Sequence, residues 1–248
     1  MNAIYILWLR ALKRYVRSRA RVIGSLGQPL LFLLALGFGF GPIFQRAGQG
    51  NYIQFLAPGV IGMTVLFTSI FSGIELIWDR QFGFLKETLV APVPRLTIMI
   101  ARTLGGATVA VIQGAIVVVI CLAAGFHPRS LATLPEAFMF MALIGVMFTA
   151  FGTAIASVLS DFQGFQFVMN FLVMPVFFLS GALFPLTNLP KLLDVIASID
   201  PLSYGVDGLR GSLTGAVHFG LGTDLAVLTA VTAALLALGG YLFSRIQL

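Results

Sequence analysis

Six long apolar runs constrain this chain more than any other feature of its sequence. Only Glu75 carries a charge within them. About 20 apolar residues in a helix cross the roughly 30 Å hydrocarbon core of a bilayer, and runs of this length lack the alternation of barrel strands. The sequence therefore predicts an all-α membrane protein with six transmembrane helices, at about 22–44, 53–78, 103–124, 137–159, 165–185 and 225–244.

The composition agrees with this prediction and excludes an ordinary soluble domain. Charged residues make up 10% of the chain, whereas soluble domains average about 25%. Residues 10–21 contain six of the 15 Lys and Arg residues and directly precede the first apolar run. A cluster in this place is typical of the flank of a membrane helix, so no nucleic-acid partner is expected. The first run also exceeds the roughly 7 to 15 apolar residues of a cleaved signal peptide.

The distribution of basic residues predicts the orientation. With the N-terminus in the cytoplasm, eleven Lys and Arg residues fall in cytoplasmic segments and four in outer segments: Arg46, Arg129, Lys191 and Arg210. Short loops rich in Lys and Arg stay on the cytoplasmic side. We therefore expect a multi-pass protein of the cytoplasmic (inner) membrane, in contact with its lipids, with both termini in the cytoplasm.

The N-terminal segment is predicted to be an amphipathic helix. In residues 1–21, Leu7, Trp8, Ala11 and Tyr15 follow the spacing of one helix face, and the basic residues gather on the opposite face. We expect this helix to lie along the cytoplasmic surface. Residues 22–248 are predicted to form a single six-helix transmembrane domain.

The second loop, residues 79–95, is predicted to contain a short cytoplasmic helix. Phe82, Leu85 and Leu89 have helical spacing, and Pro92 and Pro94 end any helix that reaches them. An amphipathic helix at this place is a docking element for another protein. The alternative is a solvated loop whose Phe and Leu side chains enter the membrane interface.

The fifth loop, residues 186–224, is too long for an unstructured connection. Apolar spacing predicts one short helix that ends at Asp200-Pro201 and a second that carries Val206, Leu209 and Leu213, with Asp207 and Arg210 three apart on its polar side. The candidate residues of this outer element are Pro201, Tyr204, Asp207 and Arg210. Two short helices of this kind favour a re-entrant outer element; an ordinary folded outer loop is the alternative.

Three segments resemble one family of transporters. They are WDRQFGFLKETLVAPVPR at residues 78–95, FLSGALFP at 178–185 and DPLSYGVDGLR at 200–210. Together with the order of the apolar runs, they resemble ABC transporter permeases of the second exporter superfamily (ABC type-2 permeases), in particular daunorubicin-type drug exporters and nodulation-type lipooligosaccharide exporters. Gln81 departs from the acid expected in many relatives.

The resemblance implies a division of labour between subunits. A cytoplasmic ABC ATPase dimer would bind ATP and Mg. Two copies of the permease, expected to be a homodimer, would form the path. An amphipathic drug, lipid or lipid-linked glycan would move outward along it. The second loop would seat a coupling helix in a groove of the ATPase. The residues implied to make this contact are Asp79, Arg80, Gln81, Phe82, Gly83, Phe84, Leu85, Lys86, Glu87 and Leu89.

Two features within the apolar runs are candidates for a gate or a substrate path. Glu75 is an ionisable group in a span, with Asp79 four residues further and Arg80 or Arg102 as possible partners. It either contacts substrate or fixes the helix end at the headgroup boundary. In the fifth run, Phe171 and Phe178 either line a hydrophobic path or face lipid, and Pro175 is expected to bend the helix.

No set of residues predicts catalysis, so an enzyme is not expected. His127 and His218 have no H-E-x-x-H motif or carboxylate cluster around them, and Cys121 is the single cysteine. The phosphate-binding pattern G-x-x-x-x-G-K-[ST] is absent, so neither a metal nor a cofactor is expected on this chain. The remaining alternative is an ion-gradient-driven secondary transporter or channel subunit, which the scarcity of intramembrane acids disfavours.

Overall fold

The computed structural model is a bundle of helices, with no strand in residues 2–46, 50–90, 92–159, 161–187 and 189–246, the ranges it describes. Met1 of the predicted N-terminal helix and the side chain of Arg21 lie outside the description. The helices are α1 (Asn2–Arg17), α2 (Arg19–Arg46), α3 (Tyr52–Gln81), α4 (Phe84–Val90), α5 (Arg95–Ala123), α6 (Leu134–Val158), α7 (Phe162–Val168), α8 (Met174–Leu179), α9 (Lys191–Ile199), α10 (Pro201–Thr214) and α11 (Leu221–Ser244).

Within the described residues, six helical segments are long and apolar enough to cross a membrane, which confirms the predicted fold class. They are Val22–Arg46, Tyr52–Gln81, Arg95–Ala123, Leu131–Val158, Phe162–Leu179 and Leu221–Ser244. Several extend into polar sequence that an apolar window does not include, because a helix keeps its backbone hydrogen bonds beyond the hydrocarbon. The third, for example, begins at Arg95 and not at 103.

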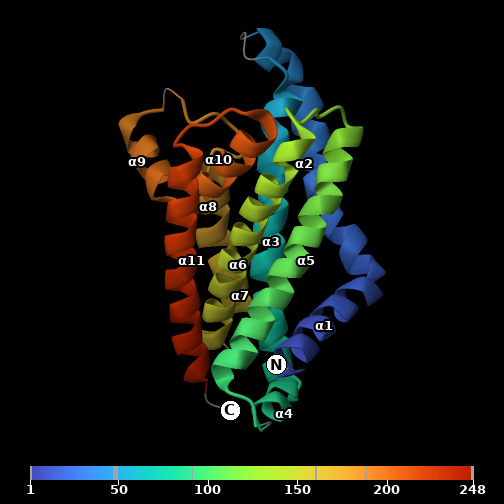
Figure 1. Cartoon of the computed structure of the whole chain (residues 1–248), viewed down its shortest axis with the longest axis vertical. Helices are drawn as coiled ribbons and strands as arrows, with labels where there is room; N and C mark the ends of the chain where they lie inside the picture. The colour runs from blue at the N-terminus through green and yellow to red at the C-terminus, as the bar shows by residue number, and fades with distance from the viewer. Residues whose placement is uncertain (1, 47–49, 91, 160, 188, 247–248) are drawn as a thin grey trace.

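Helix α3 lies at the centre of the bundle, against α2, α5 and α6 (Figure 1). It is buried along most of its length, whereas α2 and α11 are mostly exposed. Close helix approach depends on glycine here: a Cβ on Gly152 of α6 would lie 2.6 Å from the Ile70 carbonyl oxygen of α3. By contrast, Gly39 and Gly41 in α2 face open space, whereas a Cβ on Gly37 would lie 3.3 Å from Ile53 Cγ1 of α3.

Helix α1 crosses α5 obliquely (Figure 1). Trp8 Nε1 donates a hydrogen bond to Thr108 Oγ1 at 3.0 Å, and the Tyr15 hydroxyl donates to Gln113 Oε1. These bonds satisfy polar groups on an otherwise apolar helix surface, and they hold α1 against the transmembrane bundle.

Both chain ends and α4 lie at the same end of the bundle, and α9 and α10 lie at the other (Figure 1). This arrangement follows from an even number of crossings. It places the predicted docking element and the predicted outer element on opposite sides of the molecule.

Candidate functional site

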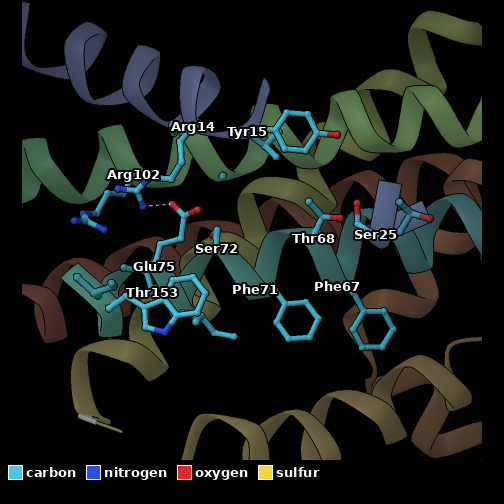
Figure 2. Close-up of a pocket in the computed structure, with 18 of the residues that line it drawn as sticks. Arg14, Tyr15, Ser25, Phe67, Thr68, Phe71, Ser72, Glu75, Arg102 and Thr153 are labelled. Carbon is cyan, nitrogen blue, oxygen red and sulfur yellow. Dashed lines mark hydrogen bonds and ion pairs between the residues drawn. The ribbon is translucent and has the colours of Figure 1, made fainter. Parts of the chain in front are cut away.

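A cavity of about 520 Å³ lies between α1, α2, α3 and α5. This size is typical of pockets that bind small molecules. One end of the cavity carries charged side chains from α1, α3 and α5, and aromatic side chains of α3 continue along it (Figure 2). The cavity therefore combines a polar end with an apolar wall.

Asp79 is the centre of the charged end. Its carboxylate pairs with Arg102 of α5 and lies 3.5 Å from an Arg10 nitrogen and 3.6 Å from an Arg14 nitrogen, both of α1. Arg14 also pairs with Glu75 Oε2 at 3.1 Å (Figure 2). Burial lowers the pKa of Arg10, an effect that the nearby Asp79 opposes. The network joins three helices by charge-assisted hydrogen bonds.

Arg80, the other expected partner of the acids, lies elsewhere. Its guanidinium donates to the carbonyl oxygens of Ser157 and Leu159, each at 3.3 Å, at the C-terminal end of α6. Unsatisfied carbonyls at a helix end favour a cation. Arg80 therefore stabilises the junction of α3 and α6.

The second loop contains a helix, but with different bounds and a different face from those expected. Asp79, Arg80 and Gln81 form the last turn of α3, and α4 begins only at Phe84. Gly83 between them has φ +78°, a left-handed conformation that favours glycine. Because the helix breaks there, Phe82 does not share a face with Leu85 and Leu89.

The side chains around α4 divide into an anchor and an exposed set. Leu85 is completely buried, and Leu89 packs on the core. Phe82 is 83% exposed, and Lys86 and Glu87 are also exposed. The short helix is thus fixed by one buried leucine and presents both apolar and charged groups outward.

Helix α4 is also linked to the cavity. The Arg10 guanidinium lies over the Phe84 ring, 3.5 Å from its centroid, while the same guanidinium contacts Asp79. A cation over an aromatic face is attracted by the ring quadrupole. Arg10 therefore contacts both the first residue of α4 and the charged end of the cavity.

The fifth span does not contribute its candidate residues to this cavity. Phe171 is 79% exposed and Phe178 is 45% exposed, and neither lines the cavity. A π-helical turn, Met169–Val173, directly precedes Pro175. Proline lacks an amide donor, so a change of hydrogen-bond register before it is the expected local response.

The polar candidate residues of the outer element fix α10 to its surroundings by separate hydrogen bonds. Asp200 caps α10 by accepting from the Leu202 amide at 2.8 Å, with Pro201 in the first turn, and its burial raises its pKa to about 7. The Tyr204 hydroxyl donates to the Ser198 carbonyl at 2.7 Å. These bonds hold α10 against the end of α9.

Asp207 and Arg210 are both buried, which corrects their predicted place on a polar helix side. Asp207 accepts from the backbone amides of His218 and Phe219, at 2.9 and 2.7 Å. Arg210 donates to the Gly181 carbonyl at 2.8 Å, and burial lowers its pKa to about 10. They tie α10 to the loops on either side of it.

Comparison with known proteins assigns this architecture to a family. A family model described as ABC-2 type transporter matches residues 2–214. The chain belongs to this family. It is 30% identical over 217 residues to transport permease ycf38 of Cyanophora paradoxa, covering 85% of this chain and 73% of that protein. It is also 30% identical over 213 residues to nodulation protein J of Rhizobium leguminosarum bv. trifolii, covering 85% and 78%.

As an ABC-2 permease, the chain is a multi-pass membrane protein and the transport subunit of an ABC transporter, a class that works with an ATPase partner. This assignment confirms the resemblance read from the three sequence segments. Among the described residues, no three His, Cys, Asp or Glu side chains gather where they could hold a metal ion.

The sequence did not identify two residues of the permease cavity, Arg10 and Arg14. Their spacing of four puts them on one face of α1, but Lys13 and Arg17 appeared to belong to the same basic face. In the structure Lys13 and Arg17 are exposed, while Arg10 and Arg14 line the cavity. The sequence signal that could have identified these two arginines is the pair of acids on α3, Glu75 and Asp79, because carboxylates at the edge of a membrane span need cationic partners.

Proposed function

We propose that this ABC-2 permease forms the membrane pathway of an ATP-driven exporter in the cytoplasmic membrane. Its cargo is an amphipathic drug, lipid or lipid-linked glycan that moves outward. The similarity to nodulation protein J and the resemblance to lipooligosaccharide exporters support this cargo class. The cavity with one charged end and an apolar wall is compatible with an amphipathic molecule.

We assign the end of the bundle that carries α4 and both termini to the cytoplasm (Figure 1). The basic residues support this orientation, because eleven of the 15 belong to that end. The four others, including Lys191 and Arg210, belong to the end with α9 and α10. In this orientation the charged end of the cavity lies toward the cytoplasm.

Helix α4 is the proposed contact with the ATPase dimer, which binds ATP and Mg. The observation that carries this proposal is the pairing of a buried anchor, Leu85, with the exposed Phe82, Lys86 and Glu87 at the cytoplasmic end. Closure of the ATPase then acts on a helix that contacts Arg10, and through Arg10 the cavity. Asp79 is buried in the ion-pair network and acts inside the bundle.

A second copy of the permease completes the proposed exporter. Helices α2 and α7–α8 leave large aromatic side chains exposed, among them Phe38, Phe40 and Phe171. Contiguous apolar surface on neighbouring helices is available for lipid and for a partner subunit. We propose a homodimer, with both lipid and the partner covering these faces.

Co-purification and transport test this function together. The permease, expressed with a candidate ABC ATPase, is expected to retain that ATPase in detergent and to move cargo out of cells only while ATP is present. Export that continues after ATP depletion, from a permease that retains no ATPase, would instead favour a secondary transporter or channel.

A further inference from the structure

The charged end of the cavity has an excess of positive charge. Among its described lining residues, the three guanidinium groups of Arg10, Arg14 and Arg102 face two carboxylates, Glu75 and Asp79. One positive charge therefore remains at the edge of the membrane-spanning region. An uncompensated charge is costly near hydrocarbon, so an anion at this place stabilises the site.

The ion pairs leave donor capacity free. Asp79 is shared by all three guanidiniums, although one carboxylate offers only two oxygens to them. Each guanidinium has five N–H donors, whereas in these ion pairs Arg10 and Arg102 each use one nitrogen and Arg14 uses two. Guanidinium groups in a fixed fork match the oxygens of a phosphate. The spare donors and the excess charge thus favour the same class of ligand.

The rest of the cavity fits an apolar tail. From Asp79 the lining continues along α3 to Met63. Figure 2 shows Phe71 and Phe67 along this wall, beyond Glu75. Sixteen helical residues span about 24 Å, most of the roughly 30 Å hydrocarbon thickness. Phe71 is 42% exposed, so part of this wall is free for contact. The charged end lies next to α4, and the apolar wall leads away from it into the membrane.

We propose that this cavity binds an amphiphile whose headgroup carries a phosphate-type anion, with the headgroup on Arg10, Arg14 and Arg102 and the tail along Phe67 and Phe71. The inference deepens the proposed function, on which it rests, because it names the class of cargo: an anionic amphiphile from the cytoplasmic side of the membrane. It predicts discrimination between headgroups on identical tails.

Trp78 lines the cavity and reports on its occupant. The only other tryptophan is Trp8, so in a Trp8→Phe background Trp78 is the sole tryptophan, which is excited at a wavelength that the five tyrosines do not absorb. The hydrogen bond from Tyr15 to Gln113 still holds α1 against the bundle in this background. The full-length chain in this background is reconstituted in phosphatidylcholine vesicles that contain a minor fraction of lipid with brominated tails, which quench tryptophan on contact. The brominated lipid is either phosphatidylglycerol or phosphatidylcholine.

Brominated phosphatidylglycerol is expected to reach half-quenching at about a tenfold lower fraction than brominated phosphatidylcholine. Both lipids carry a phosphate, but the choline cation neutralises that of phosphatidylcholine and is repelled by the excess positive charge of the site, whereas phosphatidylglycerol is a net anion. Arg14→Gln is expected to remove most of this preference. Arg10→Gln is the second variant, since Asp79 then keeps Arg14 and Arg102 as partners. Equal half-quenching by the two lipids overturns the proposal.

Lys13→Gln is the matched control, because it removes one positive charge from the exposed side of the same helix. It is expected to keep the preference, and an equal loss in Lys13→Gln and Arg14→Gln means that surface attraction alone selects the lipid and overturns the site. Glycerol phosphate, which has the headgroup phosphate but no tail, is expected to compete only in large excess over the lipid. If it abolishes the preference at a concentration equal to that of the lipid, the tail contributes nothing, the ligand is a free phosphate and the amphiphile is refuted.

The quenching assay contains no ATP and no ATPase, so its result is independent of the transport test. A headgroup preference without ATP-dependent export refutes the proposed function alone. ATP-dependent export with no headgroup preference refutes the anionic amphiphile alone.

Discussion

Replacing Phe82 by alanine separates docking of the ATPase from folding of the permease. The Phe82 ring is 83% exposed in the permease, so its truncation removes few contacts within the fold. Surface substitutions of this kind change stability by less than about 0.5 kcal/mol. We therefore expect Phe82→Ala to leave the melting temperature of the isolated permease unchanged.

The same ring has most of its area available to a partner. Full burial of a phenylalanine side chain contributes about 1.5–3 kcal/mol. A groove that covers the exposed part of Phe82 therefore contributes roughly 2 kcal/mol, and Phe82→Ala weakens ATPase binding about 30-fold. Leu85→Ala behaves in the opposite way: Leu85 is completely buried, so its truncation costs about 2–5 kcal/mol of fold stability.

The assay titrates the purified ATPase onto the permease in lipid nanodiscs and measures binding, with thermal unfolding of the permease alone in parallel. Leu131→Ala is the control, because Leu131 is 71% exposed at the opposite end of the molecule and is expected to bind the ATPase as the unmodified chain does. Wild-type affinity in Phe82→Ala would refute the assignment of this surface to the ATPase.

Three further predictions concern other parts of the molecule. Glu75→Gln is expected to lower export while the ATPase still co-purifies, because the charge opposite Arg14 is lost; unchanged export removes Glu75 from the gate. Gly152→Ala is expected to lower the melting temperature and the free energy of unfolding, the latter by about 1–3 kcal/mol, since its Cβ would meet a backbone oxygen of α3. Gly39→Ala is the control and is expected to be neutral, because its Cβ would lie in open space. Burial raises the pKa of Asp200 to about 7, so the folded state holds more protons than the unfolded state, and the free energy of unfolding falls as pH rises from about 4 to 7. Asp200→Asn keeps the helix cap and is expected to flatten this part of the pH profile. An unchanged slope of melting temperature against pH in this variant contradicts the argument.

Much of the helical architecture was predictable because its signals are local. The six apolar runs became six membrane-length helices, and Asp200-Pro201 ended α9 as their sequence indicates. That the same two residues also begin α10 was not predicted. The second-loop helix was also expected, and α4 is present. In each case a few neighbouring residues determine backbone conformation, through apolar length, a capping side chain or a missing amide.

The predictions that changed concern which way side chains face. Phe82 and Leu85 were assigned to one face, but the break at Gly83 exposes the first and buries the second. Asp207 and Arg210 are three apart on a helix, yet each is bonded to a different loop and both are buried. Helical spacing relates residues within one helix and carries no information about the neighbour that the helix meets.

By itself the sequence determined that this chain lies in a membrane, how many times it crosses, and which family it resembles, because apolar length, charge distribution and contiguous motifs are properties of order along the chain. The tertiary structure alone decided that Arg10 and Arg14 of α1 meet the two acids of α3 and Arg102 of α5 at one end of a cavity. Arg10 and Arg14 are separated from the two acids by 61 to 69 positions in sequence, and Arg102 is separated from them by 23 to 27. Only the packing of α1 across α5 brings their charges within a few ångströms, where attraction in a poorly hydrated environment becomes strong.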